Sequence, residues 1–279
     1  MKRLVTVTGS RTNTLWHFFK YYETLVDEIY VVVYEWEGMS TYDEVEKISK
    51  EFSNVQIIKR SKKEKFNWEH VTYLYNQIKM LHPNDWWIIA DDDEFHIYSK
   101  PLNQIIATCD RNGWELVRGG FIDRIGIDGE FSELKNDVDI FEQFPLAGFF
   151  RYPLSGACPN KVCIMKGHIE ITAGQHYAKI NGETTWKWQG WNHPLIAPTN
   201  EYNVQVHHFK WDSTCIDRIK AVADIKKEYS YSKEYQIMYD ALKSNNFKID
   251  IYDESFMIEN CKYQQYEQWN KLFKIIQSV

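Results

Sequence analysis

Four consecutive acids, Asp91 to Glu94, are the residues whose types and spacing most directly suggest chemistry. They follow residues 86–90, a short apolar run rich in aromatic and β-branched residues, which predicts a buried strand. Like charges at the end of a strand repel one another unless a divalent cation, a basic ligand or raised pKa values offset them. The alternative is a helix N-terminus, but a cap needs only one or two acids.

Within this cluster, Asp91 and Asp93 form an Asp-x-Asp arrangement. In extended geometry these two residues share a face while Asp92 points elsewhere. Mn²⁺ or Mg²⁺ takes oxygen ligands and is usually held by one or two carboxylates together with substrate phosphates. We therefore expect Asp93 to ligate a cation, and Asp91 to bind it through water or to hold ribose hydroxyls.

The elements that must position these acids alternate along the first part of the chain. Strands are expected at residues 4–8, 29–34, 55–59 and 86–90, with helices at 15–25, 42–52 and 68–81 between them. This alternation predicts right-handed βαβ units and a mostly parallel α/β sheet, in which ligands bind beyond the carboxyl ends of the strands. The residues expected on that rim are Thr8, Gly9, Ser10, Arg11, Glu35, Lys59, Arg60 and the four acids.

Glycine-rich phosphate loops are absent from the sequence. Neither Gly-x-Gly-x-x-Gly after the first strand nor Gly-x-x-x-x-Gly-Lys-[Ser/Thr] occurs, which argues against a dinucleotide fold and a P-loop nucleotidase. If phosphates bind at this rim, a metal held by acids is expected to neutralise them.

Beyond Pro101 the pattern is less regular. We expect a helix to about Cys109, a strand at 114–122 leading to Asp123 and Arg124, and an irregular loop region at 141–159. A hairpin is expected from 161–165 and 169–172, and a strand at 202–209. From 213 onward the pattern is mainly helical, which suggests one domain at 1–212, with a nucleotide half (1–100) and an acceptor half (101–212), and a helical extension at 213–279.

The order of motifs resembles the GT-A glycosyltransferases related to family 2, and within them the group whose acidic motif reads Asp-x-Asp-Glu-Phe. The resemblance spans residues 4–211 and rests on Asp91-Asp92-Asp93-Glu94-Phe95, Asp123-Arg124 with Asp128-Gly129, Phe144-Pro145, Lys161-Val162, Gly174-Gln175-His176 and His208-Phe209-Lys210-Trp211. It implies a GT-A fold, a mixed sheet flanked by helices. The activity it implies is metal-dependent transfer of a sugar from a nucleoside-diphosphate sugar, such as a UDP-sugar.

Carried onto this chain, the resemblance implies that Thr8, Gly9, Ser10, Arg11 and Glu35 contact the nucleoside. His208 becomes a further metal ligand and Lys210 lies near the diphosphate. Along an extended strand His207 and His208 face opposite ways, so His207 is the alternative only if the strand ends earlier. Asp92 departs from the small apolar residue often found in the middle of the motif, and it either faces a helix or contacts the donor.

The transfer chemistry needs two further groups. Lys210 and Arg124 are expected to stabilise the negative charge of the departing diphosphate. An inverting displacement also needs a general base, for which Asp123 is the candidate. An ion pair between Asp123 and Arg124 is the structural alternative, and a retaining mechanism stays open. His176 is placed for the donor or acceptor sugar.

Composition bears on nucleic-acid or membrane binding, on location and on the state of the cysteines. The formal net charge of −6 provides no global basic field for nucleic acid or membrane. No apolar run is long enough for a signal peptide or a membrane span, so we expect a cytoplasmic protein. The five scattered cysteines predict neither disulfides nor a structural zinc site. Trp186, Trp188 and Trp191 form either a sugar-stacking flap or ordinary loop packing.

Two other functions fit the same residues, namely nucleotidyl transfer on a sugar phosphate and non-catalytic carbohydrate binding. The acceptor is open among a glycan, a lipid-linked sugar, a protein and a modified nucleic-acid base.

Overall fold

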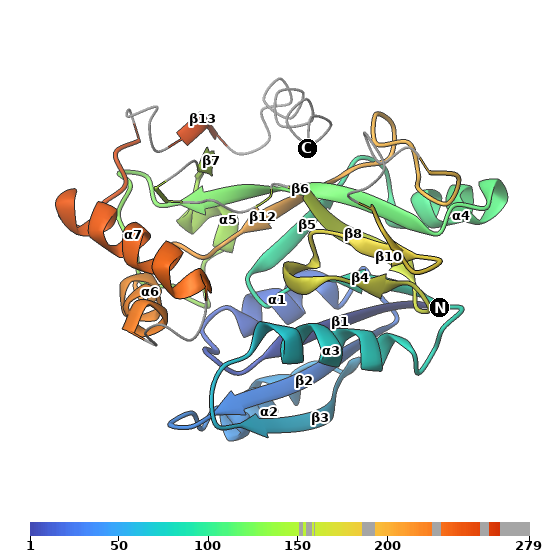
Figure 1. Cartoon of the computed structure of the whole chain (residues 1–279), viewed down its shortest axis with the longest axis horizontal. Coiled ribbons are helices and arrows are strands. Elements are labelled where there is room, and N and C mark those ends of the chain that lie inside the picture. The colour runs from blue at the N-terminus through green and yellow to red at the C-terminus, as the bar shows by residue number, and fades with distance from the viewer. Residues whose placement is uncertain are drawn as a thin grey trace. The chain divides into compact units, whose positions relative to one another are not determined.

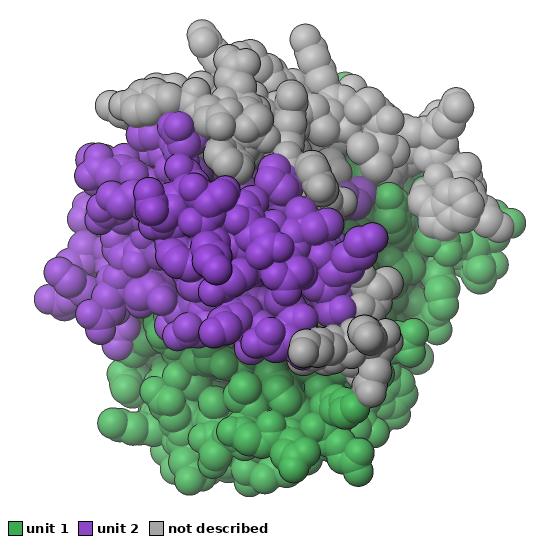
Figure 2. Space-filling model, turned by 60° about the vertical axis from the view of Figure 1, so that its left-hand side comes forward, with its two compact units in different colours: residues 1–121, 159–206, 273–279 green, residues 122–158, 207–272 purple. Residues whose placement is uncertain are grey.

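The computed structural model describes residues 1–150, 153–154, 158, 160–185, 193–224, 230–251 and 257–262. These residues fall into two compact units, each built from separate stretches of sequence (Figure 2). Unit 1 takes its described residues from 1–121 and 159–206, and unit 2 takes them from 122–158 and 207–272. The division at residue 212 expected from the sequence stays a prediction.

The core of unit 1 is a parallel sheet. Its strands are β1 (Lys2–Thr8), β2 (Glu28–Trp36), β3 (Val55–Lys63) and β4 (Trp86–Ile89), in the order β4-β1-β2-β3 (Figure 1). β1 pairs in parallel with both β2 and β4, and β2 pairs in parallel with β3. The predicted mostly parallel α/β arrangement is confirmed here.

Beyond β4 the sheet becomes antiparallel. β8 (Asn160–Lys166) pairs with β4, and residues 116–120 of β6 (Leu116–Ile125) pair with β8. β5 (Glu94–Tyr98) begins within the acidic cluster itself and pairs with β12 (Val204–His208). The strand β5 was not predicted, because a strand that begins with a charged residue directly after three acids has no clear start in the sequence.

Helices cover both faces of the parallel strands. α1 (Leu15–Tyr22) and α2 (Tyr42–Ser49) lie on one face and α3 (Trp68–Lys79) lies on the other (Figure 1). The side chain of Asn67 caps α3 by accepting a hydrogen bond from the backbone N–H of His70. The buried stripe of α3 packs on alternate residues of β1 and β2; the cluster includes Val71, Leu74, Tyr75, Ile78, Val5, Tyr30, Val32 and Tyr34.

The hairpin predicted at 161–172 is wrong. β9 (Glu170–Ile171) leaves β8 and instead forms a small antiparallel sheet with β10 (Ala178–Ile180) and β11 (Glu183–Thr184). The intervening turn is held elsewhere, because the N–H groups of Gly167 and His168 donate to the carbonyls of Asp85 and Pro83. The short helix η1 (Ala173–Gln175) follows β9, and α4 (Leu102–Asn112) completes unit 1.

In unit 2, residues 123–125 of β6 pair with β7 (Leu146–Phe150), which also pairs with β13 (Met257–Lys262). α5 (Ile140–Gln143) and β7 occupy much of the region predicted to be an irregular loop, so that prediction was wrong there. Because this region is rich in Phe, Pro and Gly, its sequence has no local pattern that predicts β7. This strand pairs with β13, which lies far away in the sequence.

The expected helical C-terminal part is confirmed by α6 (Cys215–Asp224) and α7 (Ser230–Ser244), while β13 was not anticipated. The two helices pack around an apolar cluster that includes Trp211, Ile219, Met238 and Leu242. Across the described part of the chain, no helix combines the length and apolarity needed to cross a membrane.

Candidate functional site

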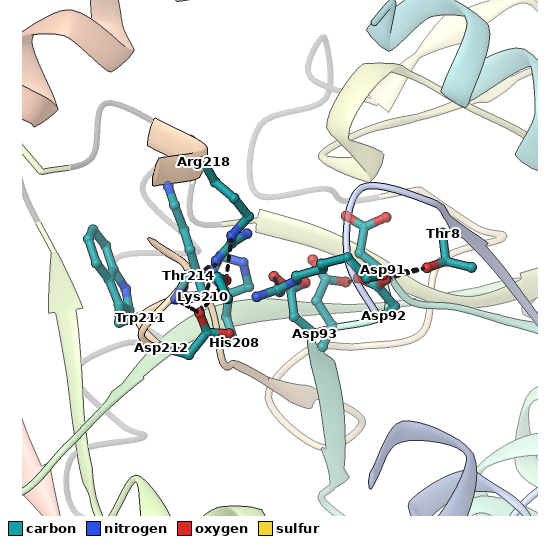
Figure 3. A network of polar contacts seen from close by, with 12 residues as sticks. Thr8, Asp91, Asp92, Asp93, His208, Lys210, Trp211, Asp212, Thr214 and Arg218 are labelled. Atoms are coloured by element: carbon teal, nitrogen blue, oxygen red, sulfur yellow. Dashed lines mark hydrogen bonds and ion pairs between the residues drawn. The ribbon is translucent and has the colours of Figure 1, made fainter. Parts of the chain in front are cut away.

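The acidic cluster lies next to the end of β1, as the parallel topology requires. β1 and β4 run in register from Lys2 opposite Trp86 to Val5 opposite Ile89, so their carboxyl ends open on the same edge. The Thr8 hydroxyl donates a 2.6 Å hydrogen bond to Asp92 Oδ2 (Figure 3). Arg11 forms an ion pair with Asp93. The structure therefore brings the predicted Thr8, Arg11 and acidic residues together.

Asp92 is buried beneath this edge. Burial raises the pKa of its carboxyl to about 6, with the Arg11 guanidinium lowering it and the neighbouring Asp93 raising it. The hydrogen bond from Thr8 compensates part of the loss of water around the charged form. Asp92 thus faces the end of β1, and its expected contact with the donor stays a prediction.

Asp91 has a different environment on the same loop. The Tyr75 hydroxyl donates to its Oδ1 at 2.6 Å, and the Gln175 amide donates to the same oxygen at 3.0 Å. Its side chain keeps 26% of its surface exposed, compared with 11% for Asp93 and 1% for Glu94. Asp91 is therefore the most accessible of these three carboxylates.

Lys161 of β8 adds a buried positive charge to the acidic cluster that was not predicted from the sequence. Its ammonium lies 2.7 Å from Glu94 Oε1 and 3.8 Å from Asp91 Oδ2, and it donates to Gly174 O at 3.0 Å and to the Gln175 side chain. Burial alone lowers the pKa of Lys161, but the Glu94 and Asp91 carboxylates outweigh it and raise the pKa above the usual lysine value. A lone lysine in the apolar strand 160–165 was the available signal, because a buried cation requires a buried acid.

The charge balance of the cluster bears on whether it fits a metal. Asp91 to Glu94 contribute four negative charges when ionised, and Arg11 and Lys161 contribute two positive charges, which leaves −2. Among the described residues, no group of three or more His, Cys, Asp or Glu side chains is arranged to hold a metal ion. The described residues therefore form no all-protein metal cage, and a cation at this cluster would need phosphate ligands of its own.

Glu35, predicted to contact the nucleoside, organises the next part of the edge. Its buried carboxylate accepts hydrogen bonds from the N–H groups of Thr41 and Tyr42 at the start of α2, and from Arg60 Nε at 2.9 Å. Burial raises the pKa of Glu35, but the Arg60 guanidinium and the two N–H groups outweigh it and lower the pKa below its usual value. The predicted residues Glu35 and Arg60 are thus paired with each other.

Gly9 and Ser10 form the turn after β1. Gly9 has a φ of +148°, and a Cβ added there would lie 1.9 Å from the carbonyl oxygen of Tyr34. Its own carbonyl accepts a 3.0 Å hydrogen bond from the Thr41 hydroxyl. Only glycine permits this close approach of β1 and β2, while Ser10 is exposed.

His176 lies beside the cluster, immediately after Gln175. Its Nδ1 is 2.9 Å from Asn160 O, and because a carbonyl only accepts, Nδ1 carries the proton. Burial, followed by the positive charge of Lys161, lowers the pKa of His176 to about 4. The imidazole is therefore neutral at pH 7.

The other predicted residues belong to unit 2. His208 Nδ1 lies 3.0 Å from Asp123 Oδ1, and the Trp211 indole N–H donates to the same oxygen at 2.8 Å. The Arg218 guanidinium donates to Lys210 O and lies 3.9 Å from Asp212 (Figure 3).

Arg124 faces away from Asp123, as neighbouring residues on a strand do. Its buried guanidinium donates to Phe144 O at 2.9 Å and to Phe141 O at 3.3 Å and lies over the Phe141 ring. These contacts are structural, and its expected role at the diphosphate stays a prediction. Trp186, Trp188 and Trp191 lie outside the described residues.

Comparison with known proteins gives structural matches only. No protein-family model matches the sequence, and no curated protein matches it. TarS residues 1–349 from S. aureus, in complex with UDP, is similar with a TM-score of 0.38 and 11% identity over 99% of this chain and 79% of that chain. A putative glucose-1-phosphate thymidylyltransferase from Bacillus anthracis is similar with a TM-score of 0.30 and 7% identity over 100% and 96%.

Mannose-6-phosphate isomerase from Helicobacter pylori is a third match, with a TM-score of 0.32 and 16% identity over 60% of this chain and 71% of that chain. At TM-scores this low, these similarities carry no argument about the activity of this chain.

Proposed function

We propose that this chain is a glycosyltransferase that moves a sugar from a nucleoside-diphosphate sugar to an acceptor hydroxyl, with a divalent cation at Asp91 and Asp93. The observation that carries the proposal is the acidic cluster at the carboxyl ends of β1 and β4, with two of its charges compensated by Arg11 and Lys161. The position of the cluster matches the ligand edge of a parallel sheet, and Asp91 is more exposed there than Asp93 or Glu94.

The residues around the cluster have distinct parts in the proposed reaction. Asp91 and Asp93 hold the cation or the ribose, and Thr8, Gly9, Ser10, Glu35 and Arg60 surround the nucleoside. Arg11 lies beside Asp93 and supplies positive charge for the diphosphate. The roles expected for His208 as a cation ligand and for Lys210 near the diphosphate stay predictions. The bound cation supplies charge neutralisation at the leaving nucleoside diphosphate.

His176 is the residue proposed to lie near the sugar. His176 is neutral at pH 7 and is suited to hydrogen bonding with sugar hydroxyls rather than to charge stabilisation. A carboxylate is also required as general base for an inverting displacement, and Asp123 is the proposed candidate. The sugar, the acceptor and the stereochemical outcome stay open.

Product analysis tests the reaction class. A panel of nucleotide sugars is incubated with the protein and Mn²⁺, and the released nucleotide is separated and quantified. Release of nucleoside diphosphate is expected, whereas formation of nucleoside triphosphate and sugar phosphate when pyrophosphate is added would indicate nucleotidyl transfer. Binding of nucleotide sugars without any release would indicate a carbohydrate-binding protein.

A matched pair of variants ties the activity to the cluster. Asp93→Asn is expected to lower turnover at least about a hundredfold. The cation that neutralises the leaving diphosphate in the transition state would lose a carboxylate ligand. Asp110→Asn removes an exposed carboxylate that pairs with Lys166 and is expected to leave turnover unchanged. Equal activity of the two variants would contradict the proposed site.

A further inference from the structure

Gln175 is a buried residue whose side chain bridges two charged groups at the acidic cluster. It ends the short helix η1, and only 2% of its surface is exposed. Its amide nitrogen donates to Asp91 Oδ1 at 3.0 Å, and its amide oxygen accepts a hydrogen bond from the Lys161 ammonium. All three residues belong to unit 1, so the whole bridge lies within one compact unit.

The chemistry of its two neighbours fixes which way this amide points. A carboxylate only accepts hydrogen bonds, and an ammonium only donates them. The –NH₂ group of Gln175 therefore faces Asp91 and its oxygen faces Lys161, because the flipped amide would place donor against donor and acceptor against acceptor. A side chain with only a donor or only an acceptor would not satisfy both neighbours.

The backbone of Gln175 is also unusual. Its φ is +54°, in the left-handed region that few residues other than glycine adopt. Its N–H donates to Thr172 O at 3.0 Å, and Lys161 donates to the adjacent carbonyl oxygen of Gly174 at 3.0 Å. A strained conformation of this kind persists where surrounding contacts enforce it, often at ligand sites. The contacts of Lys161 therefore hold the Gln175 amide in one position despite the local cost.

Asp91 Oδ1 receives a second donor from α3. The hydroxyl of Tyr75, a buried residue, lies 2.6 Å from it. A carboxylate oxygen has two lone pairs, so the Tyr75 hydroxyl and the Gln175 amide together occupy Oδ1. Within the part of the chain that the structure describes, Oδ2 accepts no hydrogen bond, and the Lys161 ammonium lies 3.8 Å from it. The two donors thus fix the rotation of the carboxylate and leave Oδ2 for a ligand.

Exposure separates the residue that meets a ligand from the residues that support it. The Asp91 side chain keeps 26% of its surface exposed, whereas Gln175, Tyr75 and Lys161 are buried. The three buried residues therefore act on a ligand through the Asp91 carboxylate and do not touch the ligand themselves.

We propose that Gln175 is a positioning residue for nucleotide binding, which holds the Asp91 carboxylate in one orientation and is itself held by Lys161. The ligand, a nucleoside diphosphate at this edge of the sheet, rests on the proposed function. A carboxylate that is already oriented costs less to order on binding than one that rotates freely, whether it meets the cation or the ribose. Loss of Gln175 should therefore weaken binding without removing a group that touches the nucleotide.

Calorimetric titration of the full chain measures this effect. UDP, GDP, CDP and ADP are each titrated with Mn²⁺ present, and the nucleotide that binds most tightly is used throughout. Gln175→Met keeps the side-chain length but removes both the donor and the acceptor, so we expect the dissociation constant to rise about tenfold. Gln77→Met makes the same change at an exposed glutamine of α3 that accepts from Lys59, and the dissociation constant should not change.

A double-mutant cycle tests whether Gln175 acts through Asp91. In the Asp91→Ala protein the carboxylate is absent, so adding Gln175→Met should change the dissociation constant by less than about twofold. A residue that only supports the fold would lower the unfolding temperature without this coupling. Unchanged nucleotide affinity in Gln175→Met, or a further tenfold loss in the double variant, would overturn the inference.

Gln175→Asn is the second variant, in case Gln175→Met does not fold. Asparagine keeps an amide and tolerates a left-handed backbone, but its side chain is one methylene shorter and does not span Asp91 and Lys161 together. We expect weaker nucleotide binding here as well, and an affinity equal to that of the parent protein would overturn the positioning role.

The results separate this inference from the proposed function. A parent protein that binds nucleotide sugars but releases no nucleoside diphosphate contradicts the proposed reaction, while the cycle on nucleotide affinity still decides the role of Gln175. A parent that binds nucleotide as tightly as its Gln175 variants overturns the positioning role and leaves the proposed function in place. A parent that binds none of the four nucleotides with Mn²⁺ overturns both.

Discussion

Lys161 and Glu94 form a buried ion pair in which the ammonium lies 2.7 Å from Oε1, with only 2% and 1% of the two side chains exposed. The pair joins β8 to the first residue of β5, and Lys161 also reaches toward Asp91 on the preceding loop. A buried charge of either sign requires a partner of opposite charge. The ion pair therefore fixes the acidic cluster to β8.

Replacing one member of this pair should therefore be strongly destabilising. Lys161→Met leaves Glu94 buried without its cation, and we expect the free energy of unfolding to fall by about 3 to 5 kcal/mol. Lys166→Met in the same strand removes an exposed pair with Asp110 and should cost less than about 1 kcal/mol. Urea unfolding of both variants is the measurement, and similar losses would contradict a special role for Lys161.

The ion pair between Arg11 and Asp93 predicts opposite effects on two ligands. Arg11→Gln removes the cation that competes for the Asp93 carboxylate, so binding of Mn²⁺ alone should strengthen by about tenfold. UDP binding without metal should weaken, because a positive charge is lost beside the diphosphate.

Calorimetric titration of each ligand measures these two effects. Arg60→Gln, which removes a cation paired with Glu35, serves as the control and should leave the affinity for Mn²⁺ unchanged. A parallel loss of both affinities in Arg11→Gln would show that Arg11 serves only to support the fold.

Lys79 makes stability depend on pH. Burial lowers the pKa of its ammonium to about 7, compared with about 10.4 in an unfolded chain. Between these values the unfolded state binds more protons, so the free energy of unfolding should rise with pH, by on the order of 1 to 2 kcal/mol from pH 7 to about 8.5. Above that range buried groups with raised pKa values, such as Cys109, oppose the rise.

The variant Lys79→Met should abolish the rise, as measured by urea unfolding at several pH values. Lys179→Met, at an exposed lysine paired with Glu170, should keep the parent's slope. A Lys79→Met protein with the parent's pH profile would show that another group titrates in this window.

Gly9 should not tolerate a side chain. In Gly9→Ala the new Cβ would meet the Tyr34 carbonyl oxygen at 1.9 Å, so β1 and β2 must separate, and we expect a loss of at least about 3 kcal/mol. Gly38 also has a positive φ, +86°, but nothing lies within 4 Å of an added Cβ. Gly38→Ala should therefore cost only about 1 to 2 kcal/mol by thermal unfolding.

Local sequence pattern was sufficient to predict the parallel half of the sheet and the position of the acids beside the end of its first strand. Apolar runs of strand length, separated by amphipathic helices, imply βαβ units, and the parallel direction brings Thr8 and Arg11 beside the acids. Strands completed by distant partners were harder to predict. β7 and β13 pair across more than a hundred residues, so neither has a local signal for its partner.

The sequence by itself determined which residue types are available: four acids at the end of a strand, a nearby arginine, and two adjacent histidines before a lysine and a tryptophan. Only the tertiary structure decided how the charges are compensated. It buried Asp92, paired Glu94 with Lys161, and joined Asp123 to His208 rather than to Arg124. Charge pairing depends on distance and burial, and both are set by contacts between segments far apart in the chain.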